Sequence, residues 1–257
     1  MKNEIYEDLY LLEKLSLAFG PSGFEDMVAD IVLSQIDGFC DEYYTDKLGN
    51  VIAVIRGGGA APLPRLMLAA HMDEVGFMIN YIEEDGTLRF DCIGGMDPRI
   101  LSGRRINILS RGEFVPGIIA SKPIHLQTKE EREECTPADK MYIDIGADSK
   151  ESAGALCSIG DFAAFDSEFV YFGECLHRIK GKALDDRLGC AALIDVMRDI
   201  HSSGDIRPFD IYFAFTVREE VGLSGAGTAA YSISPDLCVV IETTAVADIA
   251  DVPKSEQ

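Results

Sequence analysis

Apolar residues recur every three or four positions near the start of the chain, and acidic residues stand between them. The apolar positions of this stretch are Ile5, Leu9, Leu12 and Leu15. Their spacing predicts an amphipathic helix over residues 4–18. Because charged residues interrupt the apolar ones, the segment differs from the continuous apolar region of a secretory signal.

A second helix and several strands are predicted before residue 74. Ser22 and Glu25 have the spacing of a capping box, which predicts a helix that continues to about Ile36. Runs typical of strands follow at residues 42–46, 50–55 and 66–70. The last of these runs leads directly into a short motif that contains histidine and acidic residues.

The middle of the chain has a different pattern, in which short apolar runs alternate with glycine-containing turns. The runs predict strands at residues 77–82, 88–93, 106–109, 116–120 and 141–145. Many short strands without long helices are typical of a small β-barrel or sandwich. We therefore expect a β-barrel-like insert domain over residues 75–174.

Beyond residue 182 the chain returns to alternating helices and strands. A helix is predicted to start at Asp185 and Asp186, and it is followed by a strand, a helix and a strand at residues 210–217, 223–231 and 237–241. This alternation predicts a mostly parallel sheet with helices on both faces. The expected fold class is α/β, with residues 1–74 and 175–257 forming one discontinuous domain around the insert.

The net charge of the chain argues against two classes of binding partner. The sequence has 44 Asp and Glu residues against 23 Lys and Arg residues, a formal net charge of -21. A surface this acidic repels nucleic-acid backbones and anionic lipid headgroups, so we expect neither nucleic acid nor a membrane as a partner. A solvated surface is one explanation of the charge, and carboxylates that converge on cations are another.

The cysteines indicate the redox compartment. They are widely spaced and include no CxxC pair, at Cys40, Cys92, Cys135, Cys157, Cys175, Cys190 and Cys238. This pattern favours reduced cysteines in the core of a cytosolic protein over a disulfide framework or a zinc finger. The sequence also contains no run of 18 apolar residues that would predict a membrane span.

Four short motifs rich in carboxylates carry the candidate chemistry, at residues 71–74, 182–187, 216–222 and 242–244. Three of them directly follow a predicted apolar strand. In open α/β sheets, ligands bind at the carboxyl ends of the strands. We therefore expect the side chains of these motifs to meet at one edge of the sheet.

The first two motifs each have a structural and a functional interpretation. His71 and Asp73 point the same way in an extended chain, so Asp73 can orient a metal-binding imidazole; a surface pair is the alternative. Asp185 and Asp186 can cap the following helix and favour its dipole. Alternatively, one of these two carboxylates bridges a pair of metal ions.

Glu219 and Glu220 are adjacent at the end of a predicted buried strand. Carboxylates there raise each other's pKa or meet a cation, although a solvated loop is the alternative. One can bind metal while the other acts as a general base. With His71 and Glu242, they supply the nitrogen and oxygen ligands that a hydrolytic pair of zinc or cobalt ions requires.

In this order the motifs resemble the TET-type metallo-aminopeptidase family. The family includes glutamyl and deblocking aminopeptidases, and some members carry the older labels cellulase M or endoglucanase M. The similarity rests on residues 20–25, 70–76, 182–189 and 218–225. Residues 93–99 and 121–125 are similar to the insert domain of the family.

The resemblance implies two divalent metal ions, zinc or cobalt, with defined ligands. His71 and Glu242 would hold the first ion, Glu220 the second, and Asp185 would bridge both. Family members continue further and supply another metal-binding histidine near their C-terminus, whereas this sequence stops at Gln257. We therefore expect the C-terminal part of the family to be missing and the second site to lack one ligand.

The resemblance also implies catalytic roles and an assembly. Glu219 would be the general base and acid, and Asp73 would orient His71. The peptide bond between Asp185 and Asp186 would be cis. The insert would be an oligomerisation domain, which implies a homo-oligomer between a dimer and a dodecamer.

Three functions remain open at this point. The leading one is metal-dependent removal of the N-terminal residue from peptide substrates in the cytoplasm. The second is a truncated, non-catalytic remnant that binds metal or oligomerises, and it is suggested by the missing histidine. An endoglucanase is the third, because paired carboxylates also cleave glycosidic bonds, although such a site rarely needs His71.

Overall fold

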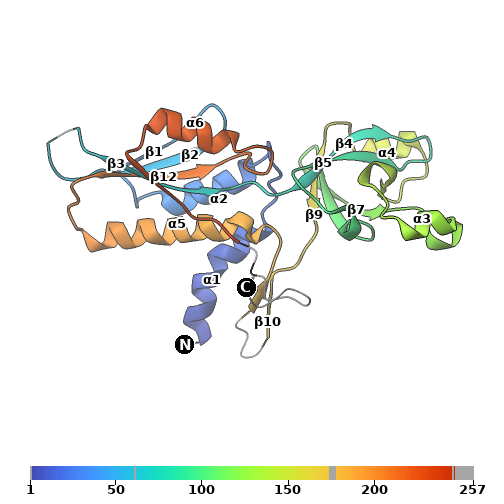
Figure 1. Ribbon diagram of the computed structural model, residues 1–257, viewed down its shortest axis with the longest axis horizontal. Coiled ribbons are helices and arrows are strands. Elements are labelled where there is room, and N and C mark those ends of the chain that lie inside the picture. The colour runs from blue at the N-terminus through green and yellow to red at the C-terminus, as the bar shows by residue number, and fades with distance from the viewer. Residues whose placement is uncertain (1, 61, 174–177, 245, 247–257) are drawn as a thin grey trace.

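The computed structural model describes residues 2–60, 62–173, 178–244 and 246. These residues form a five-stranded sheet flanked by helices and, beside it, a closed six-stranded barrel (Figure 1). The predicted α/β class with a barrel-like insert is therefore confirmed. The division at residues 74/75 and 174/175 stays a prediction.

Three neighbouring strands of the sheet run parallel to one another. Its strands, in spatial order, are β1 (Glu42–Thr45), β2 (Val51–Ile55), β12 (Asp210–Thr216), β3 (Arg65–His71) and β13 (Leu237–Val240). β3 pairs in parallel with β12 and β13, while β2 is antiparallel to β1 and β12. The carboxyl ends of β3, β12 and β13 consequently meet at the same edge of the sheet.

Helices cover both faces of the sheet (Figure 1). They are α1 (Lys2–Leu17), α2 (Asp26–Ile36) and α5 (Leu184–Ser203) on one face and α6 (Ser224–Ile233) on the other. Successive side chains of a strand point to opposite faces. In β12, Phe213 and Phe215 are therefore buried against the three-helix side, while Tyr212 and Ala214 pack with α6.

The barrel closes in the order β4-β5-β8-β7-β6-β9. Its strands are β4 (Gly76–Ile82), β5 (Leu88–Ile93), β6 (Arg105–Ser110), β7 (Glu113–Ala120), β8 (Tyr142–Asp144) and β9 (Phe162–Phe165). Alternate residues such as Phe77, Ile79 and Ile143 fill its interior and leave no exposed surface of their own. This core is separate from the two cores of the sheet.

Short elements complete the described chain. They are α3 (Lys129–Glu133), α4 (Lys150–Leu156), β10 (Val170–Phe172), β11 (Arg178–Lys180) and 3-10 turns at Pro98–Ile100, Ile124–Leu126 and Ala138–Lys140. β10 and β11 pair antiparallel and lead back from the barrel to α5. The strands β9, β10 and β11 were not predicted from the sequence.

The capping-box prediction is wrong. Helix α2 starts at Asp26, and no side chain caps it at Glu25. The Ser22 hydroxyl donates to Asp73, 51 residues away, and Glu25 accepts amides of Gly23 and Arg218. Both side chains are used by contacts outside the helix, and the contact between Glu25 and Arg218 joins residues that are 193 positions apart in the sequence.

The cysteine prediction holds only in part. The six described cysteines are free, and Cys157 and Cys190 are buried as expected. Cys92, Cys135 and Cys238 are exposed, so their apolar sequence neighbours did not place them in a core. Cys175 lies outside the described residues. Among the described helices, none has the length and apolar composition that a bilayer crossing requires.

Candidate active site

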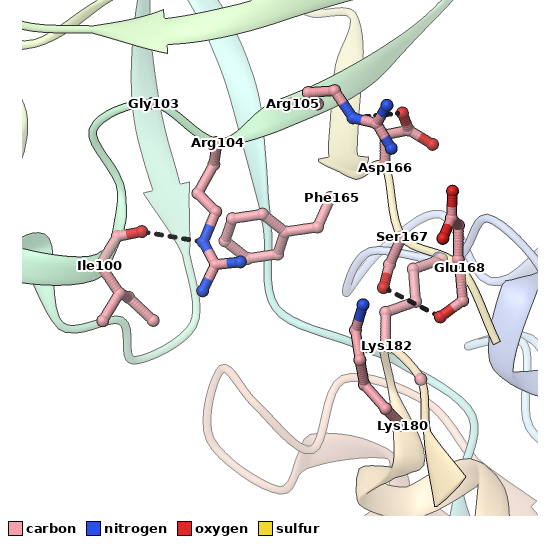
Figure 2. A pocket seen from close by; sticks show the side chains of 11 residues that line it. Ile100, Gly103, Arg104, Arg105, Phe165, Asp166, Ser167, Glu168, Lys180 and Lys182 are labelled. Atoms are coloured by element: carbon pink, nitrogen blue, oxygen red, sulfur yellow. Dashed lines mark hydrogen bonds and ion pairs between the residues drawn. The ribbon is translucent and has the colours of Figure 1, made fainter. Parts of the chain in front are cut away.

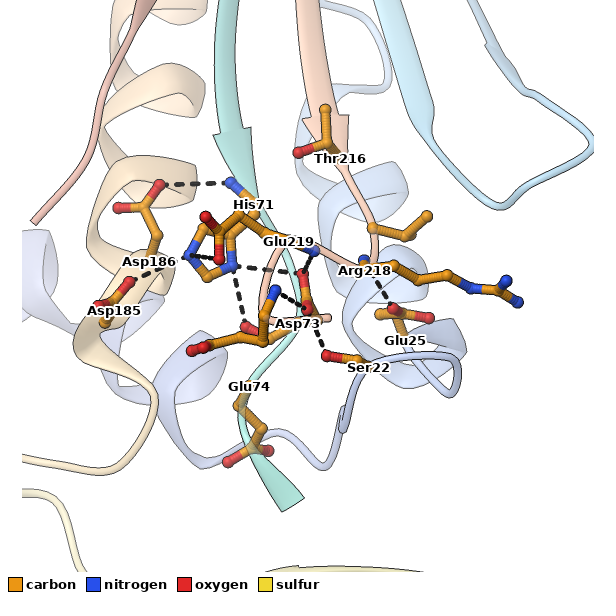
Figure 3. Close-up of polar contacts among 12 residues, drawn as sticks. Ser22, Glu25, His71, Asp73, Glu74, Asp185, Asp186, Thr216, Arg218 and Glu219 are labelled. Carbon is orange, nitrogen blue, oxygen red and sulfur yellow. Dashed lines mark hydrogen bonds and ion pairs between the residues drawn. The ribbon is translucent and has the colours of Figure 1, made fainter. Parts of the chain in front are cut away.

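Every site residue predicted from the sequence lies at the shared carboxyl edge of β3, β12 and β13 or beside it. Figure 3 shows His71, Asp73, Asp185 and Glu219 among them. His71 is the last residue of β3, and Glu219 and Glu220 belong to the turn after β12. Glu242 follows β13 by two residues, and Asp185 stands at the start of α5. Segments that are far apart in the sequence are thus brought to one place by parallel pairing.

His71 is the centre of this cluster and is only 2% exposed. Its Nε2 atom lies 3.0 Å from Asp185 Oδ1, 3.8 Å from Glu242 Oε2 and 4.0 Å from Glu219 Oε2. Its Nδ1 atom lies 3.1 Å from the carbonyl oxygen of Asp73 and 3.3 Å from the Asp73 carboxylate. Nδ1 therefore donates toward Asp73, which leaves Nε2 facing the other three acids.

The proton affinity of His71 reflects these acidic neighbours. Burial alone would lower the pKa of His71, but the hydrogen bond and charge of Asp73 outweigh it. The charges of Glu242 and Asp186 add to this effect and raise the pKa to about 9. A cationic group is thus strongly favoured at this position of the protein.

Asp73 connects the end of β3 to the turn after β12. Its Oδ1 accepts the amide of Glu219 at 2.9 Å, and its Oδ2 accepts the amide of Glu220 at 3.1 Å and the Ser22 hydroxyl at 2.5 Å. Burial would raise the pKa of Asp73, but hydrogen bonds from His71, Ser22 and Glu219 hold it below its usual value. Asp73 is therefore an anion fixed in one orientation.

The remaining carboxylates crowd one another. Burial raises the pKa of Asp186 to about 7, and the charge of Glu242 adds to the rise. Burial also raises the pKa of Glu220 to about 7; the charge of His71 opposes this rise, and the charge of Asp185 adds to it. Burial and then a hydrogen bond with Asp185 raise the pKa of Glu242. Carboxyl groups this close need either a shared proton or a cation.

The donor set fits divalent metal ions. Two groups, His71 with Asp186 and Glu242, and His71 with Glu219 and Glu220, each have ligand atoms within 4.8 Å of one another. Imidazole nitrogen with carboxylate oxygens suits zinc and accepts cobalt. The crowded acids supply the negative charge that such ions neutralise.

Asp186 is a site residue that the sequence analysis did not select. Its Oδ2 accepts the amide of His71 at 3.3 Å and its Oδ1 accepts the amide of Gly189 at 3.1 Å, so it joins the end of β3 to α5. The neighbouring Asp185 side chain is 61% exposed. The Asp185–Asp186 peptide bond is cis, as the resemblance implied.

A second hollow lies apart from this cluster, between the barrel and β11 (Figure 2). It is a cavity of about 660 Å³ lined in part by Arg104, Arg105, Asp166, Lys180 and Lys182. Arg105 is paired with Asp166 at 3.2 Å, and Lys182 is paired with Glu74. None of the acidic cluster around His71 lines this cavity, so we place the chemistry at the sheet edge instead.

Comparison with known proteins relates this fold and site to a family. The M42 glutamyl aminopeptidase family matches residues 49–257. A putative aminopeptidase of Acetivibrio thermocellus is 38% identical over 94% of this chain and 68% of its own length. A lysyl aminopeptidase of Pyrococcus furiosus is 34% identical over 92% of this chain and 66% of its own length.

A solved structure agrees with the sequence comparison. The TET aminopeptidase from the marine sediment archaeon Thaumarchaeota archaeon SCGC AB-539-E09 superposes with a TM-score of 0.90 and 37% identity, over 95% of this chain and 68% of that one. The protein therefore has the fold of a TET aminopeptidase. It spans about two thirds of the length of its relatives. The chain belongs to the M42 glutamyl aminopeptidase family.

Proposed function

We propose that the protein is a metallo-aminopeptidase that hydrolyses the N-terminal residue of peptides with two divalent ions, zinc or cobalt. The observation that carries this proposal is that Nε2 of His71 faces acids from the ends of three segments, α5, β12 and β13. Two groups of metal-capable side chains share this histidine. Membership of the M42 family supports the same reaction.

The proposed ligands follow the positions of the side chains. His71 and Glu242 would hold one ion, Glu220 the other, and Asp185 would bridge them. Asp185 is proposed as the bridge because both oxygens of Asp186 already accept backbone amides. When bound, the two ions supply Lewis-acid activation of water and of the scissile carbonyl.

The side chains of this protein would handle the protons. Glu219 would accept a proton from the attacking water at its carboxylate and return it to the leaving amine. Asp73 would keep the Nδ1 proton of His71 in place, so that Nε2 stays free as a ligand. The acidic edge of the sheet also attracts the positively charged N-terminus of a peptide, which favours cleavage at that end.

Assembly and location belong to the same proposal. The TET1 peptidase of Pyrococcus horikoshii, which is 33% identical and superposes with a TM-score of 0.81 over 96% of this chain and 72% of that one, can assemble into a tetrahedron or a large octahedral shell. We propose a homo-oligomer for this protein as well, between a dimer and a dodecamer. The reduced cysteines favour a cytoplasmic location.

The test is peptidase activity on a panel of short peptides with a free N-terminus. We expect activity that a chelator abolishes and that zinc or cobalt restores. Glu219→Gln should lower kcat by about 100- to 10,000-fold while the protein keeps its metal. Glu113→Gln, which changes an exposed acid on β7, is the matched control and should leave activity unchanged.

Other outcomes would separate the alternatives. Full activity of Glu219→Gln, or activity that resists the chelator, would contradict the proposal. Metal that binds to wild type and is lost in His71→Ala, without turnover of any peptide, would favour the non-catalytic remnant. Release of sugar from a cellulose oligomer in the presence of chelator would favour the endoglucanase.

A further inference from the structure

Side chains accept the hydrogen bonds of the backbone amides at the start of the turn that carries Glu219 and Glu220. β12 ends at Thr216, and α6 begins at Ser224. The amides of residues 217, 218, 219 and 220 donate, in that order, to Asn50 Oδ1 at 3.0 Å, Glu25 Oε1 at 3.1 Å, Asp73 Oδ1 at 2.9 Å and Asp73 Oδ2 at 3.1 Å. Three side chains from three separate segments thus satisfy four consecutive amides.

This turn needs such support because its backbone is in an unfavourable conformation. Arg218 has a φ of 57°, in the left-handed region. A residue with a side chain pays roughly 1–2 kcal/mol for that conformation. It persists only where the surroundings fix it. The residue immediately after it is Glu219, so any relaxation of Arg218 would redirect the Glu219 side chain.

The acceptors are themselves held rigidly. Asn50 has no exposed surface, and its Nδ2 donates to Asp46 Oδ2 at 2.7 Å and to the carbonyl of Gly225 at 3.0 Å. Glu25 is 7% exposed, and the same Oε1 atom that accepts the Arg218 amide also accepts the Gly23 amide at 2.7 Å. The turn is therefore joined to the start of α2 and to the start of α6.

We infer that Glu25 and Asn50 are positioning residues for Glu219, which they serve by fixing the backbone of the turn that carries it. Neither lies among the proposed metal ligands, and both act through hydrogen bonds to the main chain. The inference rests on the proposed function for its consequence on catalysis. Its structural part, the immobilisation of the turn, can be tested without any substrate.

Glu25 allows a sharp test, because the hydrogen bonds that it accepts from two backbone amides both end on its Oε1 atom. Glu25→Gln keeps a carbonyl oxygen at that place, whereas Glu25→Ala removes it. If the role of Glu25 is to accept these amides, glutamine should replace it. If its charge were what matters, glutamine should fail as badly as alanine.

The first readout is hydrogen exchange of the full chain without metal or substrate. Glu25→Ala should speed exchange of the amides of residues 217–220 by at least about tenfold, because they lose one of their fixed acceptors. Glu25→Gln should exchange as wild type does. Asp85→Ala is the matched control, since Asp85 holds a barrel turn through the Thr87 amide and should leave this segment unchanged.

The second readout is kinetics on the best peptide of the panel. Glu25→Ala should lower kcat by roughly 10- to 100-fold, the loss expected for a misplaced catalytic group, while KM stays within about twofold. Glu25→Gln should restore most of kcat. Ile143→Ala, in the barrel core, lowers stability without touching the turn and should keep kcat.

The two readouts distinguish failure of the positioning inference from failure of the proposed function. A wild type that cleaves no peptide would end the proposed function, while exchange would still decide the positioning role. Unchanged exchange in Glu25→Ala, an unchanged kcat in an active enzyme, or a Glu25→Gln variant as impaired as Glu25→Ala would each overturn the inference. Asn50→Ala, which should also speed exchange of the Val217 amide, provides an independent second variant.

Discussion

The guanidinium of Arg187 lies 3.7 Å from the carboxylate of Glu74, and the two side chains are 0% and 3% exposed. Lys182 donates to the same carboxylate. Arg187 also donates to the carbonyls of Leu15 and Ala18. These contacts join the end of α1 to the start of α5, immediately beside the candidate metal ligands.

Removal of Arg187 should therefore be costly. Arg187→Met leaves Glu74 with fewer partners and removes a charged donor from the carbonyls of Leu15 and Ala18, so we expect the free energy of unfolding to fall by about 3–5 kcal/mol. Urea denaturation of the metal-free protein at neutral pH measures it. Lys150→Met removes an exposed pair with Glu84 and should change stability by at most about 0.5 kcal/mol. Equal effects of the two variants would show that the buried network stabilises nothing.

The contrast between Ser22 and β12 shows what the sequence could predict. The apolar run at residues 210–217 is a local signal, and the strand appears at Asp210–Thr216. Ser22 and Glu25 matched a local motif, yet their hydrogen bonds reach Asp73 and Arg218. Hydrogen-bond partners that are so far apart in the chain produce no periodic pattern in the sequence, because only the fold brings them together.

The same limit applies within the site. The carboxyl ends of parallel strands could be predicted to converge, and His71, Glu219 and Glu242 do so. The different environments of Asp185 and Asp186 could not be predicted from the sequence. The backbone at these two residues departs from helical geometry, with ψ values of 108° and 38°. Side-chain direction cannot be read from sequence spacing where the backbone is irregular.

Two glycines of α6 should respond in opposite ways to alanine. A Cβ at Gly225 would lie 2.1 Å from the carbonyl of Val217 and 2.7 Å from Asn50 Oδ1, whereas one at Gly227 meets nothing within 4 Å. Gly225→Ala should destabilise the protein by about 1–3 kcal/mol and weaken metal binding, since α6 and the Glu219 turn must separate. Gly227→Ala should stabilise it by about 0.5–1 kcal/mol.

Thermal unfolding and zinc titration of the two variants provide the measurement. Both substitutions add one methyl group to the same helix, so the change in helix propensity is matched. The two variants differ only in the contact of the new Cβ atom with Val217 and Asn50, which is made at position 225 alone. A Gly225→Ala variant as stable as Gly227→Ala would mean that α6 can shift freely against the turn. In that case the hydrogen bond between Asn50 and Gly225 would not fix the site.

Glu220 gives the metal-free protein a pH dependence of defined sign. Burial raises its pKa from 4.5 to about 7, with the charge of His71 opposing and that of Asp185 adding. A carboxyl group with a higher pKa in the folded state holds its proton more tightly there. Its contribution to stability is therefore present below its unfolded pKa and is lost as the pH rises through about 7.

Glu220→Gln should remove this dependence. We expect the metal-free variant to exceed wild type in unfolding free energy by about 1–3 kcal/mol near pH ~8, and by much less near pH ~5, where Glu220 is protonated. Urea denaturation in chelator at both pH values measures the gap, and Glu113→Gln controls for the loss of one charge. Zinc should then reverse the order at the higher pH, because wild type offers a deprotonated carboxylate ligand and the variant does not. A gap that is the same at both pH values would show that Glu220 is not crowded by its acidic neighbours, and the argument that this sheet edge needs a cation would lose one of its main supports.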